Sequence, residues 1–293
     1  MHLVSDFDGV WTDPRAEADA IRDLMASRLA ETTNLSLERV KIIFSEIEQE
    51  FINNPFNYGW IFEGQITAYA MEDMYGRNHA IAIALWNSSP KFEESKLLCE
   101  AIIKISGDAE RFADACFRDG RSTYRETNKF FLVSEAAQVI SALRERDYQM
   151  TIVSNSKVTH ILDLFDAAEV SLDTFEVIGG ARKFNLGFTP SVPETLEWNT
   201  AKVSLQRPHY LELLERLKPD AVIGDVFSLD LSVPLYLRNN RKDWSHLRGG
   251  LINQPYTPAW VLNGNAASAS ELGLDILPSL KSVPSWLDRL AQK

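Results

Sequence analysis

The sequence predicts an α/β protein, in which a parallel-sheet core is interrupted near its N-terminus by an all-helical insertion. Three observations predict this class. A short apolar strand is expected at Leu3–Ser5, the sequence from about Pro14 to Gly120 has the pattern of helices, and helices alternate with strands after about Phe130. Such alternation is typical of a parallel sheet with helical connections. Because so short a strand cannot fold alone, we expect residues 1–13 and 125–293 to form one α/β domain, with residues 14–124 inserted as a helical cap domain.

The composition is that of a folded protein with a full core. The chain has 293 residues, 45% of them hydrophobic, and a net charge of -11. An acidic chain has no general attraction to nucleic acid or anionic lipid, so only a local basic pocket could bind an anion. Apolar runs stay below the ~18 residues of a spanning helix, and the N-terminus lacks the pattern of a signal peptide. We therefore expect a cytoplasmic protein without a nucleic-acid or membrane partner.

The insertion contains one helix with a clear beginning. Apolar residues recur at helical spacing from Leu37 to Phe51, and Ser36 is placed to serve as the N-cap. Further helices are expected over residues 68–86, 90–105 and 108–117.

The later part of the chain alternates between short β-rich runs and helical patterns. Strands are expected at 150–153, 175–178, 202–205 and 221–223, and helices at 134–146, 158–165 and 209–217.

Polar side chains follow three of these strands at the point where each one ends. Asp6 and Asp8 follow the first strand, Ser154 and Asn155 follow the run Ile152-Val153, and Asp225 follows Val222-Ile223-Gly224. In open parallel sheets, ligands bind at the carboxyl ends of the strands. The sequence therefore predicts a ligand site at this edge.

Asp6 and Asp8 are two residues apart, so on a regular strand they point to one face. Two carboxylates held that close repel each other, which favours a divalent cation between them. Asp225 could supply a third ligand, and a set of oxygen ligands suits Mg²⁺ better than zinc. Taken singly, each motif also fits an ordinary turn or helix-capping loop; their joint order and strand-end placement are more specific.

The ordered set of motifs resembles the haloacid dehalogenase superfamily. Its first motif is similar to Asp6-Phe7-Asp8-Gly9-Val10, its second to Ile152-Val153-Ser154-Asn155, and its fourth to Val222-Ile223-Gly224-Asp225 with Asp230 five residues on. The resemblance covers residues 1–13 and about 125–293, and implies a Rossmann-like core. The helical segment stands where that family carries a C1-type cap insertion.

The resemblance also implies roles for these residues. Asp6 would be the nucleophile that forms an aspartyl-phosphate, and Asp8 would act as general acid and then general base. Mg²⁺ would be held by Asp6, the backbone carbonyl of Asp8 and Asp225, with Asp230 ordering its surroundings. Ser154 would bind the transferring phosphoryl group, with Asn155 beside it. Dehalogenases of the superfamily lack the second aspartate, so Asp8 favours a phosphatase or phosphomutase.

The third motif departs from the family pattern, which has a lysine there. Arg207, in Gln206-Arg207-Pro208, stands in the lysine's place at the start of a helix, and Lys202 is the competitor. Both stay open, as does the role of residues 181–200, a connection longer than a simple βα loop.

The leading hypothesis is a Mg²⁺-dependent phosphatase for a small phosphorylated metabolite. The alternatives are a phosphomutase and an inactive protein that only binds a ligand. A homodimer is also left open, because no exposed stripe in the sequence demonstrates one.

Overall fold

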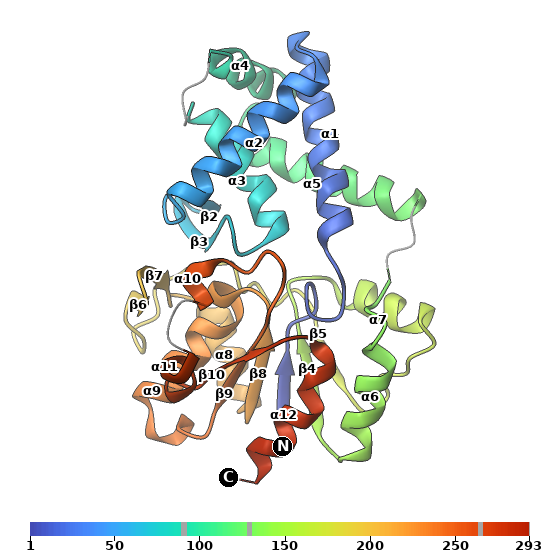
Figure 1. The fold of residues 1–293 in the computed structure, drawn as a ribbon, viewed down its shortest axis with the longest axis vertical. Helices are drawn as coiled ribbons and strands as arrows, with labels where there is room; N and C mark the ends of the chain where they lie inside the picture. The colour runs from blue at the N-terminus through green and yellow to red at the C-terminus, as the bar shows by residue number, and fades with distance from the viewer. Residues whose placement is uncertain (89–92, 128–130, 263–265, 293) are drawn as a thin grey trace. The chain divides into compact units, whose positions relative to one another are not determined.

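The computed structural model describes residues 1–88, 93–127, 131–262 and 266–292 (Figure 1). The chain divides into two compact units. The first comprises Met1–Asp13, Phe62–Thr67 and Phe131–Lys293, and the second comprises Pro14–Ile61 and Ala68–Phe130.

The first unit is built on a six-stranded sheet in which every pair of neighbours is parallel. The strand order is β10-β9-β8-β1-β4-β5, so the opening strand lies between β8 and β4. Buried residues fill the middle strands, as parallel sheets require. The bounds are β1 His2–Ser5, β4 Gln149–Val153, β5 Glu176–Ile178, β8 Ala221–Gly224, β9 Arg248–Ile252 and β10 Leu274–Leu277. The fold class is therefore α/β.

Helices connect the strands of this unit. Helix α7 runs between β4 and β5, α8 precedes β8, and α9 leads from β8 to β9. The last helix, α12, packs on α6. The bounds are α6 Ala136–Glu145, α7 Val158–Ala167, α8 Pro208–Leu217, α9 Ser232–Asn240, α10 Ala259–Leu262, α11 Ala266–Glu271 and α12 Val283–Ala291. Single turns lie at η1 Phe227–Leu231, η2 Lys242–Trp244 and η3 Leu280–Ser282.

The expected strand at 202–205 exists but lies outside the main sheet. It is β7 (Ala201–Ser204), which pairs antiparallel with β6 (Thr195–Trp198) in a hairpin. Asn199, in the turn, has a left-handed φ of 50°, which asparagine tolerates well. Since β7 is part of a local hairpin, its end does not belong to the edge where β1, β4 and β8 end.

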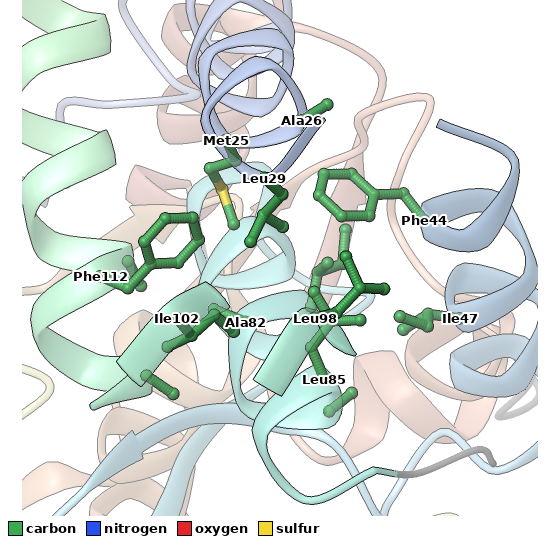
Figure 2. Close-up of a cluster of buried hydrophobic side chains, with 14 of the residues drawn as sticks. Met25, Ala26, Leu29, Phe44, Ile47, Ala82, Leu85, Leu98, Ile102 and Phe112 are labelled. Carbon is green, nitrogen blue, oxygen red and sulfur yellow. The ribbon is translucent and has the colours of Figure 1, made fainter. Parts of the chain in front are cut away.

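The second unit is a helical cluster around one apolar core (Figure 2). Its helices are α1 Arg15–Thr33, α2 Leu37–Asn53, α3 Met74–Trp86, α4 Ser95–Ser106 and α5 Ala109–Thr127. Each contributes fully buried side chains that meet in the middle, among them Leu29, Phe44, Leu85, Ile102 and Phe112. The side chain of Ser36 accepts a hydrogen bond from the Arg39 N–H, which confirms the expected N-cap of α2.

The expectation of an all-helical insertion is wrong in one place. Residues 59–69 form a two-stranded hairpin, β2 (Gly59–Phe62) and β3 (Gln65–Tyr69), where the sequence patterns predicted a helix from residue 68. Glu63 and Gly64 take left-handed φ values of 48° and 79°, which reverse the chain between the two strands, and the residues that follow pair with β2 as strand β3 instead of starting a helix at residue 68. Helix α3 accordingly begins only at Met74, after Asp73 caps it. Residue 90, the expected start of the next helix, lies outside the described residues.

None of the helices in the described ranges has both the length and the apolar character needed to cross a bilayer.

Candidate active site

Three adjacent strands bring the predicted polar residues to one edge of the sheet. Because β1 is paired with both β4 and β8, the residues after these strands leave the sheet side by side. The Asp6 N–H donates to the Ile223 carbonyl at 2.9 Å, so the ladder continues one residue past β1. The structure thus brings Asp6, Ser154 and Asp225 to the same edge.

Two glycines make room for two of the carboxylates. Gly9 has a φ of +78°, and a Cβ built on it would lie 2.1 Å from Asp225 Oδ2. A Cβ on Gly224 would lie 2.4 Å from Asp230 Oδ2. Any side chain at either position would displace a carboxylate, so the close packing of Asp225 and Asp230 depends on both glycines.

Asp6, Asp225 and Asp230 form a compact carboxylate group, whose candidate ligand atoms all lie within 4.8 Å of one another. Asp225 is further oriented by the Tyr256 hydroxyl, which donates to its Oδ2 at 2.7 Å. Asp225 and Asp230 are buried. Clustered, buried oxygen donors repel one another without a counter-charge, and they suit Mg²⁺. The residues present therefore fit the expected cation.

The side chain of Asp8 is not part of that carboxylate group. Its Oδ2 accepts a hydrogen bond of 2.7 Å from the Ser156 hydroxyl. This hydroxyl donor orients the Asp8 carboxylate. Its side chain is therefore placed apart from the three candidate metal ligands.

The cation beside Asp6 is Lys183, which the sequence patterns did not single out. Its Nζ lies 2.5 Å from Asp6 Oδ1 and 2.6 Å from Asp230 Oδ1. The side chain is 3% exposed. Burial lowers the pKa of Lys183, but the charges of Asp230 and Asp6 outweigh burial and hold this pKa above its ordinary value. Lys183 is therefore an ammonium ion.

The pKa of the Asp6 carboxyl is raised to about 8, and burial is the largest cause. Lys183 opposes this shift, while the charges of Asp230 and Asp8 add to it. A divalent cation at the carboxylate group would favour the ionised form. Whether the Asp6 carboxyl is ionised therefore depends on the charged groups around it.

The two candidates for the third-motif cation, Arg207 and Lys202, contact groups other than Asp6, so a role of either one as that cation stays a prediction. The side chain of Lys202 is 73% exposed, lies on the β6–β7 hairpin, and faces Glu197 at 3.9 Å. Arg207 is fully buried, but its guanidinium donates to the Lys183 carbonyl and to Thr67, and Asp6 is not among these acceptors. Pro208, which follows Arg207, starts α8 as the sequence predicts. The local structure of this motif is therefore as expected, whereas the contacts of the Arg207 guanidinium differ from those expected.

A signal for Lys183 exists in the sequence. It lies five residues after β5, which is paired with β4 in the main sheet. Ligands bind at the carboxyl ends of parallel strands, and β5 ends at Gly179-Gly180, just before the segment that carries Lys183. This segment begins the stretch 181–200, for which the sequence patterns predict no single role.

Ser154 and Asn155 shape the loops around Asp6. Ser154 is buried, and its hydroxyl oxygen accepts a hydrogen bond from the Ser156 N–H at 3.0 Å. The Asn155 side-chain oxygen accepts the Lys183 N–H at 2.8 Å. Asn155 therefore fixes the main chain of the lysine, and a phosphoryl contact of either residue stays a prediction.

Comparison with known proteins gives structural likenesses only. No family model matches the chain, and no curated protein matches it. A haloacid dehalogenase-like family hydrolase from Xanthomonas campestris is 14% identical, with a TM-score of 0.49 over 100% of this chain and 96% of that one. A 2-haloacid dehalogenase from Pseudomonas syringae pv. Tomato is 15% identical, with a TM-score of 0.43 over 98% of both chains. A predicted phosphoglycolate phosphatase from Haemophilus somnus is 13% identical, with a TM-score of 0.41 over 97% of this chain and 96% of that one.

These proteins carry the names of different reactions, a dehalogenation and a phosphate hydrolysis. The chain is thus similar in structure to haloacid dehalogenase-like proteins, at identities and TM-scores too low to carry a reaction over to it.

Proposed function

We propose that this chain is a Mg²⁺-dependent phosphatase that hydrolyses a small phosphorylated molecule through Asp6. The observation that carries the proposal is the setting of Asp6, which shares a three-carboxylate group with Asp225 and Asp230 and contacts the Lys183 ammonium. A carboxylate with a cation beside it, at the end of a central strand, is suited to attack an anionic phosphorus centre. The resemblance of the motifs to haloacid dehalogenase-type phosphatases supports the same reading.

The proposed reaction has two steps. Asp6 forms a bond to phosphorus while the bond from phosphorus to the leaving oxygen breaks, and Asp8 donates a proton to that oxygen. Asp8 then takes a proton from water, whose oxygen attacks the phosphorus of the aspartyl-phosphate and releases phosphate and Asp6. Mg²⁺ held by Asp6, Asp225 and Asp230 would reduce the repulsion between the carboxylate and the phosphate dianion.

Asp8 is well placed for a proton-transfer role. Its side chain is outside the candidate metal ligands, and its contact with Ser156 is a single neutral hydrogen bond. A general acid must release and regain a proton, which a metal-bound carboxylate does poorly. The separation of Asp8 from the other three carboxylates therefore supports different roles for Asp6 and Asp8.

The test is the hydrolysis of para-nitrophenyl phosphate and acetyl phosphate, with and without Mg²⁺. We expect turnover that requires Mg²⁺ and is lost on chelation. Asp6→Asn should lower kcat at least about a thousandfold with the fold intact, because the nucleophile is removed. Asp288→Asn, a change at a half-buried residue paired with Arg146, is the matched control and should keep wild-type turnover.

Two results would contradict the proposal. If the Asp6→Asn variant kept its turnover, Asp6 would be excluded as the nucleophile. A folded wild-type protein with Mg²⁺ that hydrolyses no phosphoester in a panel of phosphorylated metabolites would favour the ligand-binding alternative. A phosphomutase would instead transfer the phosphoryl group within a sugar phosphate, which phosphorus NMR of the products distinguishes from release of inorganic phosphate.

A further inference from the structure

The main chain of Lys183 is held from both sides. Its N–H donates to Asn155 Oδ1 at 2.8 Å, and its carbonyl accepts a hydrogen bond from Arg207 Nη1 at 2.5 Å. Both peptide groups that flank the Cα of the lysine are therefore fixed by side chains from other segments. The preceding residue, Arg182, has a left-handed φ of 50°, so this segment is not held by a helix or strand.

Arg207 holds a second segment at the same time. Its Nη1 also donates to Thr67 Oγ1 at 2.9 Å, and its Nη2 donates to the Thr67 carbonyl at 2.5 Å. Thr67 lies on β3 and ends the segment 62–67, which belongs to the same compact unit as the sheet. The planar guanidinium fixes its acceptors in relation to one another. The position of the Lys183 carbonyl is therefore tied to Thr67.

The placement of this carbonyl matters because the Lys183 ammonium has two partners to reach. Its Nζ lies 2.5 Å from Asp6 Oδ1 and 2.6 Å from Asp230 Oδ1. A lysine side chain is a flexible stem that loses rotamer freedom when its end is fixed. A shift of the backbone by about 1 Å can change a catalytic rate on the order of a hundredfold. A fixed Lys183 backbone keeps Nζ within hydrogen-bond distance of both Asp6 and Asp230.

We propose that Arg207 is a positioning residue that sets the Lys183 ammonium against Asp6 by fixing the Lys183 carbonyl relative to Thr67. The effect of Arg207 on turnover rests on the phosphatase function proposed above. Its effect on the burial and contacts of Lys183 does not.

The test replaces Arg207 by glutamine, which keeps a polar group but loses the two-pronged donor. Reaction of each lysine with acetic anhydride is then followed by mass spectrometry, with the exposed Lys202 as internal reference. In the wild-type protein Lys183 should react slowly, because it is buried and charged. In Arg207→Gln its reaction relative to Lys202 should rise at least about fivefold, and kcat/KM should fall by about 10- to 100-fold.

The matched control is Arg248→Gln. Arg248 is also largely buried and also holds a main-chain carbonyl, that of Ser270, together with Asp275. This control should lower the midpoint of thermal unfolding without changing the labelling of Lys183 or the turnover. A purely structural Arg207 would behave like this control, so wild-type labelling in a folded Arg207→Gln would overturn the proposal.

Thr67→Val provides a second variant if Arg207→Gln does not fold. It removes one acceptor of Arg207 and keeps the Thr67 carbonyl, so we expect a rise of about two- to fivefold in the labelling of Lys183. Unchanged labelling in Thr67→Val would contradict the part of the proposal in which the Thr67 hydroxyl helps to fix the guanidinium. If the wild-type protein proves to have no phosphatase activity, the labelling comparison still decides the role of Arg207.

Discussion

At the scale of single residues, the site depends on charges that would be unfavourable alone. Asp6 and Asp230 are two carboxylates within reach of one ammonium, that of Lys183, which is 3% exposed. Removing one partner from a buried group of charges leaves the others uncompensated and costs about 3–5 kcal/mol. The same three groups therefore affect both the stability and the reactivity of Asp6.

A comparison of two lysines tests this balance. Lys183→Ala should lower kcat/KM at least about a hundredfold, because the positive charge beside Asp6 is lost. Lys202→Ala should stay within about twofold of wild type, since an exposed ion pair contributes little. Steady-state kinetics on para-nitrophenyl phosphate, with thermal unfolding to verify folding, would check both. Equal losses in the two variants would contradict the assignment of the cation to Lys183.

At the scale of elements, helix α3 is largely buried and contains a histidine, His79, whose pKa is lowered by this burial. It begins after Asp73, whose side chain accepts the Tyr75 N–H at 2.9 Å, and most of its residues are buried. His79 on this helix is 8% exposed and stacks on Trp60, with ring centroids 5.9 Å apart. Burial lowers the pKa of His79 to about 4. The folded protein therefore keeps the His79 side chain in its neutral form at neutral pH.

The stability of the protein should consequently fall in acid through His79. Its folded-state pKa is below the ordinary histidine value of about 6.5, so its contribution is complete above pH 6.5 and is lost as the pH falls towards 4. The loss amounts to about 3 kcal/mol at most. Urea unfolding of wild type and His79→Leu at several pH values should show a shallower acid decline in the variant. An exposed-histidine control, His246→Ala, should follow the wild-type curve, and a His79→Leu curve parallel to wild type would contradict the prediction.

At the scale of the whole molecule, the candidate active-site residues all belong to one of the two compact units. Asp6, Lys183, Asp225 and Asp230 come from segments separated by up to 224 residues and meet only through the strand order of the sheet. A net charge of -11 does not prevent the binding of an anionic ligand, because the Lys183 ammonium and a bound Mg²⁺ would offset the carboxylates of the site. A cation that binds between these segments should stabilise the folded chain.

Mg²⁺ should therefore raise the midpoint of thermal unfolding, more at pH 8.5 than at pH 6. The raised pKa of Asp6 means that the folded metal-free protein keeps a proton between the ordinary aspartate pKa and about 8. The contribution of Asp6 to the stability of the metal-free protein therefore falls as the pH rises through that range. Mg²⁺ competes with the proton for the Asp6 carboxylate, so it binds more tightly at the higher pH. At 100 times its dissociation constant, a ligand adds about 2.7 kcal/mol.

Differential scanning calorimetry with Mg²⁺ and with chelator would measure this effect. Asp225→Asn should lose most of the Mg²⁺ shift, whereas Asp288→Asn should keep it. A shift that survives unchanged in Asp225→Asn would place the cation elsewhere.

The sequence by itself determined the α/β class, the first strand and the strand-end residues Asp6, Ser154 and Asp225. These features follow from local patterns, because a hydrophobic run and the polar residues at its end lie within a few residues of one another in the sequence. The N-cap at Ser36 followed for the same reason. The tip of the β2–β3 hairpin was missed because left-handed φ values at Glu63 and Gly64 leave only a weak trace in a sequence.

Only the tertiary structure decided which cation stands beside Asp6. Arg207-Pro208 matched the expected local pattern, yet the guanidinium is used to hold the Lys183 carbonyl. Lys183 follows β5, and its contact with Asp6 spans 177 residues of sequence. Whether two such groups meet depends on strand order and on how each loop is anchored, and these are properties of the folded chain rather than of any short segment.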